Sequence, residues 1–306
     1  MTEPAEELPD DTAAGFRSGF VSIVGRPNAG KSTLLNAILG QKIAITTSRP
    51  QTTRNRLLGI HTTEACQIVF MDTPGIHDPQ DRLGQFMVET AVGSLAEVDV
   101  ALMVVDPRLP GKDERRVLEH LAKAGLPVLL AINKMDTVPV EKLLPVAEAY
   151  RGESMIREIV PISALQKKNV DRLLEALVGL LPEGPQYYPE DMVTDQVERF
   201  MVGEIVREKA MEQTGDELPY SLAVEVEEFS ERESGTIYIR AVIHVERESQ
   251  KAIIIGRKGE RLKKIGSLAR EEISRFLDAP VFLDLWVKRQ EKWRKDPASL
   301  RRFGYV

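Results

Sequence analysis

Residues 25–32 have the sequence Gly-Arg-Pro-Asn-Ala-Gly-Lys-Ser, and they separate the apolar run 20–24 from a stretch of helical character, 33–39. Two glycines with four residues between them, followed by Lys-Ser and placed between a strand and a helix, are the pattern of a phosphate-binding loop. No other feature constrains the fold as strongly, because the loop needs a strand before it and the N-terminus of a helix after it.

The pattern assigns roles to the polar groups of this loop. Backbone N–H groups surround the phosphates, Lys31 reaches the outer phosphates, and the Ser32 hydroxyl binds Mg²⁺. The alternative is an ordinary glycine-containing turn with Lys31 in solvent. The residues predicted to contact the phosphates are Gly25, Arg26, Pro27, Asn28, Ala29, Gly30, Lys31, Ser32 and Thr33.

A second segment, Asp72-Thr73-Pro74-Gly75, follows the apolar strand predicted over 67–71. In proteins with a phosphate-binding loop, an acidic residue at the end of the neighbouring strand holds Mg²⁺. The Gly75 N–H can bond a terminal phosphate, so the segment behind it can respond to that phosphate. We therefore predict nucleotide contacts for Asp72, Thr73, Pro74, Gly75 and Ile76, although the four-residue string alone would indicate an ordinary turn.

The base is predicted from Asn133-Lys134-Met135-Asp136, which follows the apolar strand 127–132. The Asp136 carboxylate can accept bonds from N1 and the 2-amino group of guanine, which adenine does not offer in that arrangement. A site built for those bonds rejects an analogue that lacks them. A solvated turn is the alternative. The predicted contacts to the base of GTP or GDP are Asn133, Lys134, Asp136, Ser163 and Ala164.

These four segments, in this order over 20–181, resemble the translation-factor class of GTPases. Within them, residues 49–54 are similar to the switch segment of the Era family of GTPases. The resemblance implies that Thr53 is the second hydroxyl ligand of Mg²⁺ in the triphosphate state, and the sequence leaves Thr52 open as a competitor. An ordinary polar loop is the alternative. The implied Mg²⁺ ligands are Ser32, Thr53 and Asp72, and the implied catalytic residues are Lys31, Thr53 and Gly75.

Ile76 occupies the position where Ras-type enzymes have a water-positioning Gln. An aliphatic side chain cannot orient water by hydrogen bonding, so we expect slow intrinsic hydrolysis of GTP. Relatives that share this replacement often use a K⁺ ion near the phosphates, and Asn28 matches the loop Asn that ligates it. The resemblance thus implies stimulation by K⁺, and the alternative is that Asn28 is only a turn residue.

The chain of 306 residues is long enough for about two domains, and its 42% hydrophobic residues are sufficient for packed cores. The net charge of −6 gives no overall sign of nucleic-acid binding. The acidic, Pro-containing stretch 1–18 is predicted to be a disordered leader. It lacks the basic start and apolar centre of a secretory signal, so we do not expect it to be one. No apolar stretch approaches the ~18 residues of a membrane span. Cys66 has no second Cys to pair with, which fits a cytoplasmic setting.

Apolar strands alternate with helical patterns over 19–182, which predicts an α/β GTPase domain with a mainly parallel sheet flanked by helices. The runs 57–61 and 66–71 are close enough to form one antiparallel edge. A Pro/Gly-rich stretch then interrupts the periodicity, so 183–193 is predicted to be a linker. A smaller α+β domain with a C-terminal tail is predicted over 194–306.

The second domain is predicted to contain a helix from 194, two strands, a helix, Gly-x-x-Gly, another helix and a strand. This order resembles a type II KH domain, an RNA module whose Gly-x-x-Gly loop clamps about four nucleotides. The glycines let two helix ends approach a sugar-phosphate chain, and basic residues supply the charge. A tight helix–helix turn is the alternative. The predicted RNA contacts are Gly256, Arg257, Lys258, Gly259, Arg261, Lys263 and Lys264.

A GTPase domain followed by this KH domain resembles the Era family over nearly the whole chain after the acidic leader. The resemblance implies a monomeric, GTP-hydrolysing switch that binds 16S ribosomal RNA near its 3′ end and assists assembly of the 30S subunit. It also implies Mg²⁺ and K⁺ as ions, and peripheral contact with the cytoplasmic face of the inner membrane. Two other functions stay open: an RNA-binding scaffold with nucleotide binding but little turnover, and an ATPase or small-molecule kinase, against which residues 133–136 argue.

Overall fold

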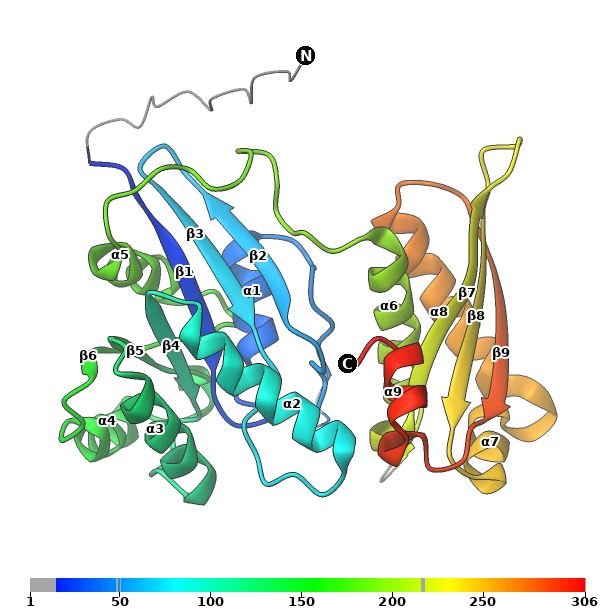
Figure 1. Ribbon diagram of the computed structural model, residues 1–306, viewed down its shortest axis with the longest axis horizontal. Helices are drawn as coiled ribbons and strands as arrows, with labels where there is room; N and C mark the ends of the chain where they lie inside the picture. The colour runs from blue at the N-terminus through cyan, green and yellow to red at the C-terminus, as the bar shows by residue number, and fades with distance from the viewer. Residues whose placement is uncertain (1–14, 48, 50, 216–217, 306) are drawn as a thin grey trace, which may run out of the picture.

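The computed structural model describes residues 15–47, 49, 51–215 and 218–305, which form two domains joined by one connecting segment (Figure 1). The first strand, β1 (Arg17–Val24), begins two residues inside the predicted acidic leader, so the first domain starts earlier than position 19. The rest of that leader, 1–14, lies outside the described residues.

A six-stranded sheet with the order β2-β3-β1-β4-β5-β6 forms the centre of the first domain. Its strands are short apolar runs, and the central ones are buried along their whole length, as expected for a parallel sheet covered on both faces. The parallel strands besides β1 are β3 (Cys66–Asp72), β4 (Val100–Val105), β5 (Val128–Ile132) and β6 (Ile156–Pro161). The edge strand β2 (Leu57–Thr62) pairs antiparallel with β3, which confirms the predicted edge.

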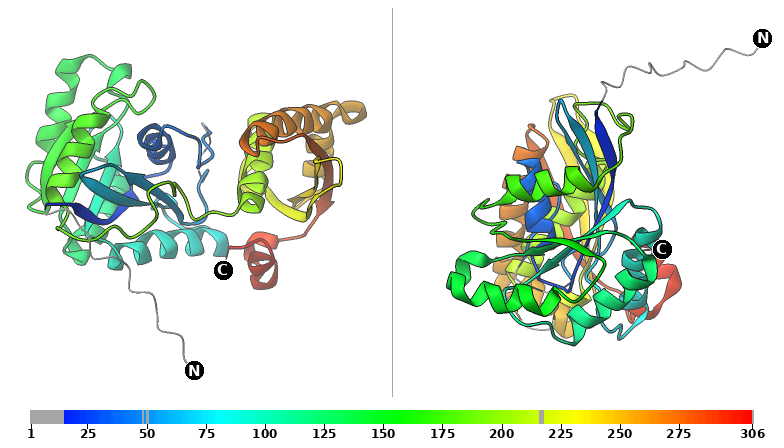
Figure 2. Two further views of the ribbon diagram at one scale, coloured as in Figure 1. Left: turned by 90° about the horizontal axis from the view of Figure 1, so that it is seen from above. Right: turned by 90° about the vertical axis from the view of Figure 1, so that its left-hand side faces the viewer.

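Helices cover both faces of this sheet (Figures 1 and 2). The helices α1 (Lys31–Leu39) and α5 (Val170–Leu180) pack on one face. On the other face lie α2 (Arg82–Gly93), α3 (Lys112–Ala124) and α4 (Leu143–Tyr150). Because the parallel strands end at one edge of the sheet, the loops that follow them gather there, which is where such folds bind ligands.

The connecting segment is bonded to the edge of the first domain. Ile60 N–H donates to the carbonyl of Val193 at 2.8 Å, and the Thr194 hydroxyl donates to the carbonyl of Leu58 at 2.7 Å. The helix that the sequence predicts from Thr194 therefore begins later, as α6 (Glu198–Glu212), because Thr194 is held against β2.

The second domain has a three-stranded sheet in the order β7-β8-β9. The strands β7 (Ala223–Glu231) and β8 (Ile237–Val245) are antiparallel, and β9 (Val281–Arg289) runs parallel to β8. The helices α6, α7 (Glu248–Ile255) and α8 (Glu260–Phe276) complete its core. This order, with 256–259 between α7 and α8, confirms the predicted KH arrangement. Within the described residues, no helix is both long and apolar enough to cross a membrane.

The C-terminal part of the chain returns to the boundary between the domains. Its last helix, α9 (Pro297–Arg302), lies near the end of α2 (Figure 2). Trp293 is fully buried and forms a hydrophobic cluster with Phe303 and Tyr305 from the tail and with Leu83 and Met87 from α2. The two domains therefore share a small core of their own.

Candidate nucleotide site and nucleic-acid loop

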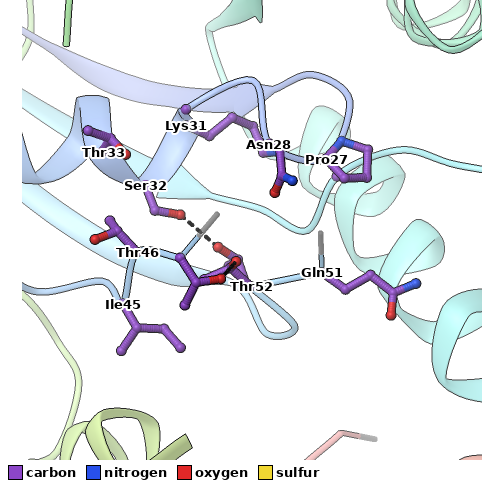
Figure 3. Close-up of a pocket in the computed structure, with 13 residues that line it drawn as sticks. Pro27, Asn28, Lys31, Ser32, Thr33, Ile45, Thr46, Gln51 and Thr52 are labelled. Atoms are coloured by element: carbon purple, nitrogen blue, oxygen red, sulfur yellow. Dashed lines mark hydrogen bonds between the residues drawn. The ribbon is translucent and has the colours of Figure 1, made fainter. Parts of the chain in front are cut away.

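The cleft at the carboxyl ends of β1 and β3 lies between the phosphate-binding loop and the segment 45–53 (Figure 3). The polar side chains that line it are Asn28, Lys31, Ser32, Thr33, Thr46, Thr47, Gln51, Thr52 and Thr53. The sequence did not point to Thr46 and Thr47, and it included Gln51 only as part of the segment 49–54, because nothing but their neighbourhood in the fold connects these residues to the loop.

The phosphate-binding loop leaves β1 and enters α1 at Lys31. Gly30 has a φ of 95°, and a Cβ there would lie 2.3 Å from Nδ2 of Asn133. Asn28 has a φ of 63°, in the left-handed region that Asn tolerates better than most residues. Backbone geometry alone therefore explains both residue types, so the identity of Asn28 does not decide whether it also binds an ion.

Lys31 is buried against its own loop, and Figure 3 shows its side chain extending toward Asn28. Its ammonium donates to the carbonyl oxygens of Gly25 at 3.4 Å and Arg26 at 3.3 Å. Burial lowers the pKa of Lys31 to about 8, although the nearby Asp72 carboxylate acts in the opposite direction. A desolvated cation whose hydrogen-bond partners are carbonyls gains strongly from an added anion, as a phosphate would provide.

Three oxygen-bearing side chains from separate segments meet beside the loop. Ser32 Oγ lies 2.7 Å from Thr53 Oγ1 and donates to Asp72 Oδ2 at 2.7 Å. Thr53 Oγ1 lies 3.2 Å from the same carboxylate oxygen. Thr52 instead donates to the carbonyl of Arg49 at 2.7 Å. The structure thus brings Thr53, and not Thr52, to Ser32 and Asp72.

This donor set fits Mg²⁺, which prefers hydroxyl and carboxylate oxygens. Asp72 Oδ1 is buried without a hydrogen-bond partner, and such an oxygen is costly unless a cation or a donor completes it. Burial raises the pKa of Asp72, opposed by Lys31 and the two hydroxyls. In the described part of the chain, no group of three or more His, Cys, Asp or Glu side chains could hold a metal ion.

Asn133 joins the base segment to the phosphate loop. Its Nδ2 donates to the carbonyl of Ala29 at 2.9 Å, and its Oδ1 accepts the Ala164 N–H at 2.9 Å. Ser163 is fully buried next to this bond, whereas Asp136 is exposed, with its carboxylate accessible to a base. The predicted base residues therefore gather at the same edge of the sheet as the loop.

A network of charged side chains behind the loop was not predicted. Arg26 bonds Asp106 and lies 3.1 Å from Glu114, while the Lys134 ammonium bonds Asp106 at 2.9 Å and the Asn28 carbonyl at 2.6 Å. The signal that the sequence offered for this network was Asp106, which directly follows the apolar run of β4. The Arg26 guanidinium is occupied by these carboxylates, so its predicted phosphate contact reduces to its backbone.

Residues 72–76 are packed tightly against the first strand. A Cβ at Gly75 would lie 2.6 Å from the nitrogen of Pro27, so Gly75 approaches the phosphate loop as only glycine can. The Thr73 hydroxyl is buried and donates to the carbonyl of Ile23 at 2.8 Å. The Ile76 side chain is fully buried in the core beneath α2, α3 and α4. The side chain of Ile76 is therefore part of this core, and the nucleotide contact of the residue stays a prediction.

The segment that carries Thr53 is bonded to the second domain through the side chain of Arg54. This arginine is buried, donates to the carbonyl of Leu222, and lies 5.7 and 5.6 Å from the ring centroids of Trp293 and Tyr305. Burial lowers the pKa of Arg54. A residue one position from the nucleotide site is therefore anchored between the domains, which the sequence gave no reason to expect.

The Gly-x-x-Gly segment 256–259 turns between α7 and α8 with left-handed backbone at Gly259 and Lys258. Arg261, which the sequence places among the RNA contacts, donates from Nη1 to the carbonyl of Ile253 and so links α8 to α7, and its RNA contact stays a prediction. Its guanidinium is thus engaged in closing the turn. The exposed basic residues around the turn are Arg257, Lys258, Lys263 and Lys264.

Two family models match the chain. The model described as 50S ribosome-binding GTPase matches residues 20–134, and the model described as KH domain matches residues 217–294. The chain is also 55% identical to the GTPase Era of Geotalea daltonii over 295 residues, covering 96% of this chain and 99% of that protein. It is 52% identical to the GTPase Era of Geobacter metallireducens, with 95% and 98% covered.

Two solved structures are similar along the whole fold. A crystal structure of Era in complex with MgGDPNP and nucleotides 1506–1542 of 16S ribosomal RNA matches with a TM-score of 0.93 and 43% identity, covering 95% of this chain and 99% of that one. A variant of Aquifex aeolicus Era bound to GDP and AlF₄⁻ matches with a TM-score of 0.92 and 44% identity, covering 95% and 100%. Both domains and their connection are therefore shared with these proteins.

Proposed function

This chain belongs to the Era family of GTPases, and on that basis we propose that it is a GTP-hydrolysing switch that binds the 3′ end of 16S ribosomal RNA and assists assembly of the 30S subunit. The observation that carries the proposal is the position of the Thr53 hydroxyl, 2.7 Å from Ser32 and 3.2 Å from Asp72. It supports a site in which the segment that adjoins the second domain lies directly beside the phosphates. The RNA named for the solved relative supports the choice of ligand.

In the proposed nucleotide complex, the loop N–H groups and the Lys31 ammonium hold the phosphates, while the Gly75 N–H bonds the terminal one. Ser32, Thr53 and Asp72 would hold Mg²⁺. Bound there, Mg²⁺ neutralises charge that develops on the phosphate oxygens. Asp136 accepts two N–H bonds from guanine, which supplies the preference over adenine nucleotides.

Hydrolysis is proposed to be slow without help and faster with K⁺. Ile76 offers no hydrogen bond to water, and its side chain lies in the core. The Asn28 side chain, on the cleft wall, is proposed to bind K⁺ near the phosphates. An added positive charge there would act where the transition state gathers negative charge.

RNA is proposed to bind at residues 256–259. Exposed Arg257 and Lys258 neutralise backbone phosphates, and Lys263 and Lys264 extend the positive surface along α8. The glycines let the backbone approach a nucleotide chain closely. This loop belongs to the second domain, so any effect of GTP on RNA binding has to pass through the contacts between domains.

GTP loading is proposed to order the segments around Thr53 and Gly75 and thereby to change how the KH surface meets RNA. Hydrolysis would then release the factor. A coupling free energy between two sites acts in both directions, so the target RNA should change the GTPase rate or the nucleotide affinity.

The protein is further proposed to work as a monomer in the cytoplasm, with peripheral contact to the inner membrane. The support for this is the family resemblance. Sedimentation of the purified protein with and without vesicles made from inner-membrane lipids tests both points. A stable dimer, or no lipid-dependent shift, would contradict the respective part.

The decisive experiment is crosslinking of RNA to the GTP-loaded protein in cells, followed by sequencing of the bound RNA. We expect reads at the 3′ end of 16S ribosomal RNA and crosslinks near residues 256–259. Single-turnover hydrolysis of GTP and ATP, with and without that RNA, separates the switch from an RNA-binding scaffold and from an ATPase. A rate that RNA leaves unchanged, together with unchanged nucleotide affinity, would remove the switch.

A further inference from the structure

The helix α6 of the RNA-binding domain holds both ends of the segment that leads to Thr53. The Arg207 guanidinium donates to the carbonyl oxygen of Thr52, and Glu208 Oε1 accepts the N–H of Thr46 at 2.8 Å. Arg207 is 0% exposed and Glu208 is 1% exposed. Two consecutive residues of one domain are thus bonded to the two ends of the cleft wall formed by the other.

Arg207 is itself held in one orientation. Glu204, one turn earlier on α6, accepts from Arg207 Nε at 2.8 Å and also from Nη2. An arginine fork bonded to a carboxylate on one side has a planar, fixed geometry, which lysine cannot reproduce. Nη2 also donates to the Thr52 carbonyl, so the fork gives this bond a defined direction, while Nη1 donates to the Met211 sulfur at 3.4 Å.

Glu208 is also balanced by charge. Lys42 lies 2.5 Å from it and Lys209 lies 2.9 Å from it, and both lysines also bond Glu272 on α8. Burying a charged group is expensive unless it is paired and hydrogen-bonded, and here every partner is supplied. Lys42 belongs to the first domain, so part of this compensation depends on the arrangement of the domains that holds the segment.

We propose that Arg207 is a positioning residue for the GTPase site, acting through Thr53. The peptide unit between Thr52 and Thr53 is planar, so fixing the Thr52 carbonyl also fixes the direction in which the Thr53 backbone begins. Thr53 then keeps its hydroxyl beside Ser32 and Asp72. This inference rests on the proposed role of Thr53 as an Mg²⁺ ligand in the triphosphate state.

A bond that merely fastens the two domains would have a different signature. If the Arg207 bond only stabilised the contact between the domains, its loss would weaken the binding of GDP and of the triphosphate equally, or would weaken neither. Loss of positioning at Thr53 would affect only the state in which Thr53 is a ligand. The readout that separates the two is the Mg²⁺ dependence of nucleotide affinity, measured separately for GDP and for the non-hydrolysable triphosphate GDPNP.

The test uses the full-length protein with Arg207→Ala, Arg207→Lys and Thr53→Ala, titrated with fluorescent GDP and GDPNP over a range of Mg²⁺. We expect Arg207→Ala to raise the half-saturating Mg²⁺ concentration for GDPNP by about tenfold or more, the effect typical of losing a residue that supports a metal ligand. The value for GDP should change less than about twofold on the same reasoning. In the Thr53→Ala background, Arg207→Ala should add nothing.

Arg199→Ala is the matched control, because Arg199 lies on the same helix and bonds the carbonyls of Val226 and Glu227 within its own domain. It should leave both Mg²⁺ curves unchanged. If Arg207→Ala does not fold, Arg207→Lys takes its place, since it keeps a cation beside Glu204 but not the fork. Equal shifts for GDP and GDPNP, an unchanged GDPNP curve, or additivity with Thr53→Ala would overturn the inference. An unchanged GDPNP curve for Thr53→Ala alone would instead refute the proposed Mg²⁺ ligand.

Discussion

The side-chain amide of Asn133 donates to the carbonyl of Ala29 at 2.9 Å, although 104 residues separate the two in sequence. The side chain of Asn133 therefore links residues 133–136 to the phosphate-binding loop, and its Oδ1 accepts the Ala164 N–H. The part of the site that we propose recognises guanine and the part that we propose holds phosphate are consequently not independent.

Gly30→Ala should damage both parts together. A Cβ at Gly30 would lie 2.3 Å from the Asn133 amide, and the φ of 95° disfavours any L-residue. We expect the affinity for GTP and GDP to fall by about tenfold or more, equivalent to at least ~1.4 kcal/mol, as measured by fluorescent nucleotide titration. Gly40→Ala is the control, because Gly40 has a φ of 71° but open space around its Cβ position. If Gly30→Ala binds nucleotide like the Gly40 variant, the bracing role of Asn133 is refuted.

Asp136→Asn should reduce the preference for guanine. The substitution removes a carboxylate that can accept two N–H bonds and leaves a group that accepts fewer. We expect the ratio of GTP to ATP affinity to fall by about 100-fold or more, as for other sites that lose a designed polar contact. Competition between labelled GTP and unlabelled ATP measures the ratio. Asp171→Asn, an exposed change on α5, should leave it unaltered.

Asn28→Gly should remove stimulation by K⁺ while preserving the loop. Asn28 has left-handed backbone, which glycine adopts without strain, so this variant deletes the side chain more cleanly than Ala would. We expect GTP hydrolysis in K⁺ to fall to the rate in Na⁺, with GDP affinity nearly unchanged. A variant that still hydrolyses GTP faster in K⁺ than in Na⁺ would show that Asn28 serves only the turn.

Arg257 and Lys258 changed together to Asp should weaken RNA binding and flatten its salt dependence. Both side chains are exposed on the turn between α7 and α8. Each lost phosphate contact should lower the slope of log affinity against log salt by about 0.7 for a single strand. The same charge change at Arg151 and Arg172, exposed on the first domain, is the control for net charge. Equal losses in the two double variants would place the RNA elsewhere.

His244 should make the protein less stable at mildly acidic pH. Burial lowers the pKa of His244, opposed by Glu225 on β7 and assisted by Arg302 of α9 and Lys288 of β9. The unfolded chain therefore takes up a proton before the folded chain does as the pH falls below the ordinary His value of 6.5. Stability is then lost between that pH and the lower folded pKa.

The measurement is the midpoint of thermal unfolding at pH 7.5 and 5.5 for the wild type and for His244→Gln. The Gln variant should lose fewer degrees between the two pH values, with a difference on the order of a few degrees. His120→Gln, on α3, controls for the loss of a histidine elsewhere. An equal pH response of the wild type and His244→Gln would contradict the argument.

The sequence predicted the parts whose chemistry is local. The loop 25–32 has its glycines, lysine and serine within a few positions, and the strands before Asp72 and Asn133 are uninterrupted apolar runs. The edge β2 and the KH order were likewise visible as periodic segments with turns between them. For these elements the pattern and the structure agree.

What the sequence could not predict depends on packing between distant segments. Arg54 and Arg207 are buried, although arginine is rarely fully buried, because each donates to a carbonyl of the other domain, Leu222 for Arg54 and Thr52 for Arg207. Arg261 has the basic character of an RNA contact but bonds a helix carbonyl, and sequence cannot separate those roles. Ile76 directly follows the segment 72–75, but its side chain packs in the hydrophobic core, and the sequence does not distinguish these two environments.

The bonds from Ile60 to Val193 and from Thr194 to Leu58 determine how the two halves of the molecule can move. Only Asp195, Gln196 and Val197 stand between the last of these bonds and the first turn of α6. A swing of the KH domain must then be produced by backbone rotation at this three-residue pivot, close to the end of a rigid strand. A short pivot of this kind restricts the rotation of the KH domain to few directions. When the contacts of Arg54, Arg207 and Trp293 between the domains break, the KH domain would therefore rotate as a unit about a defined axis.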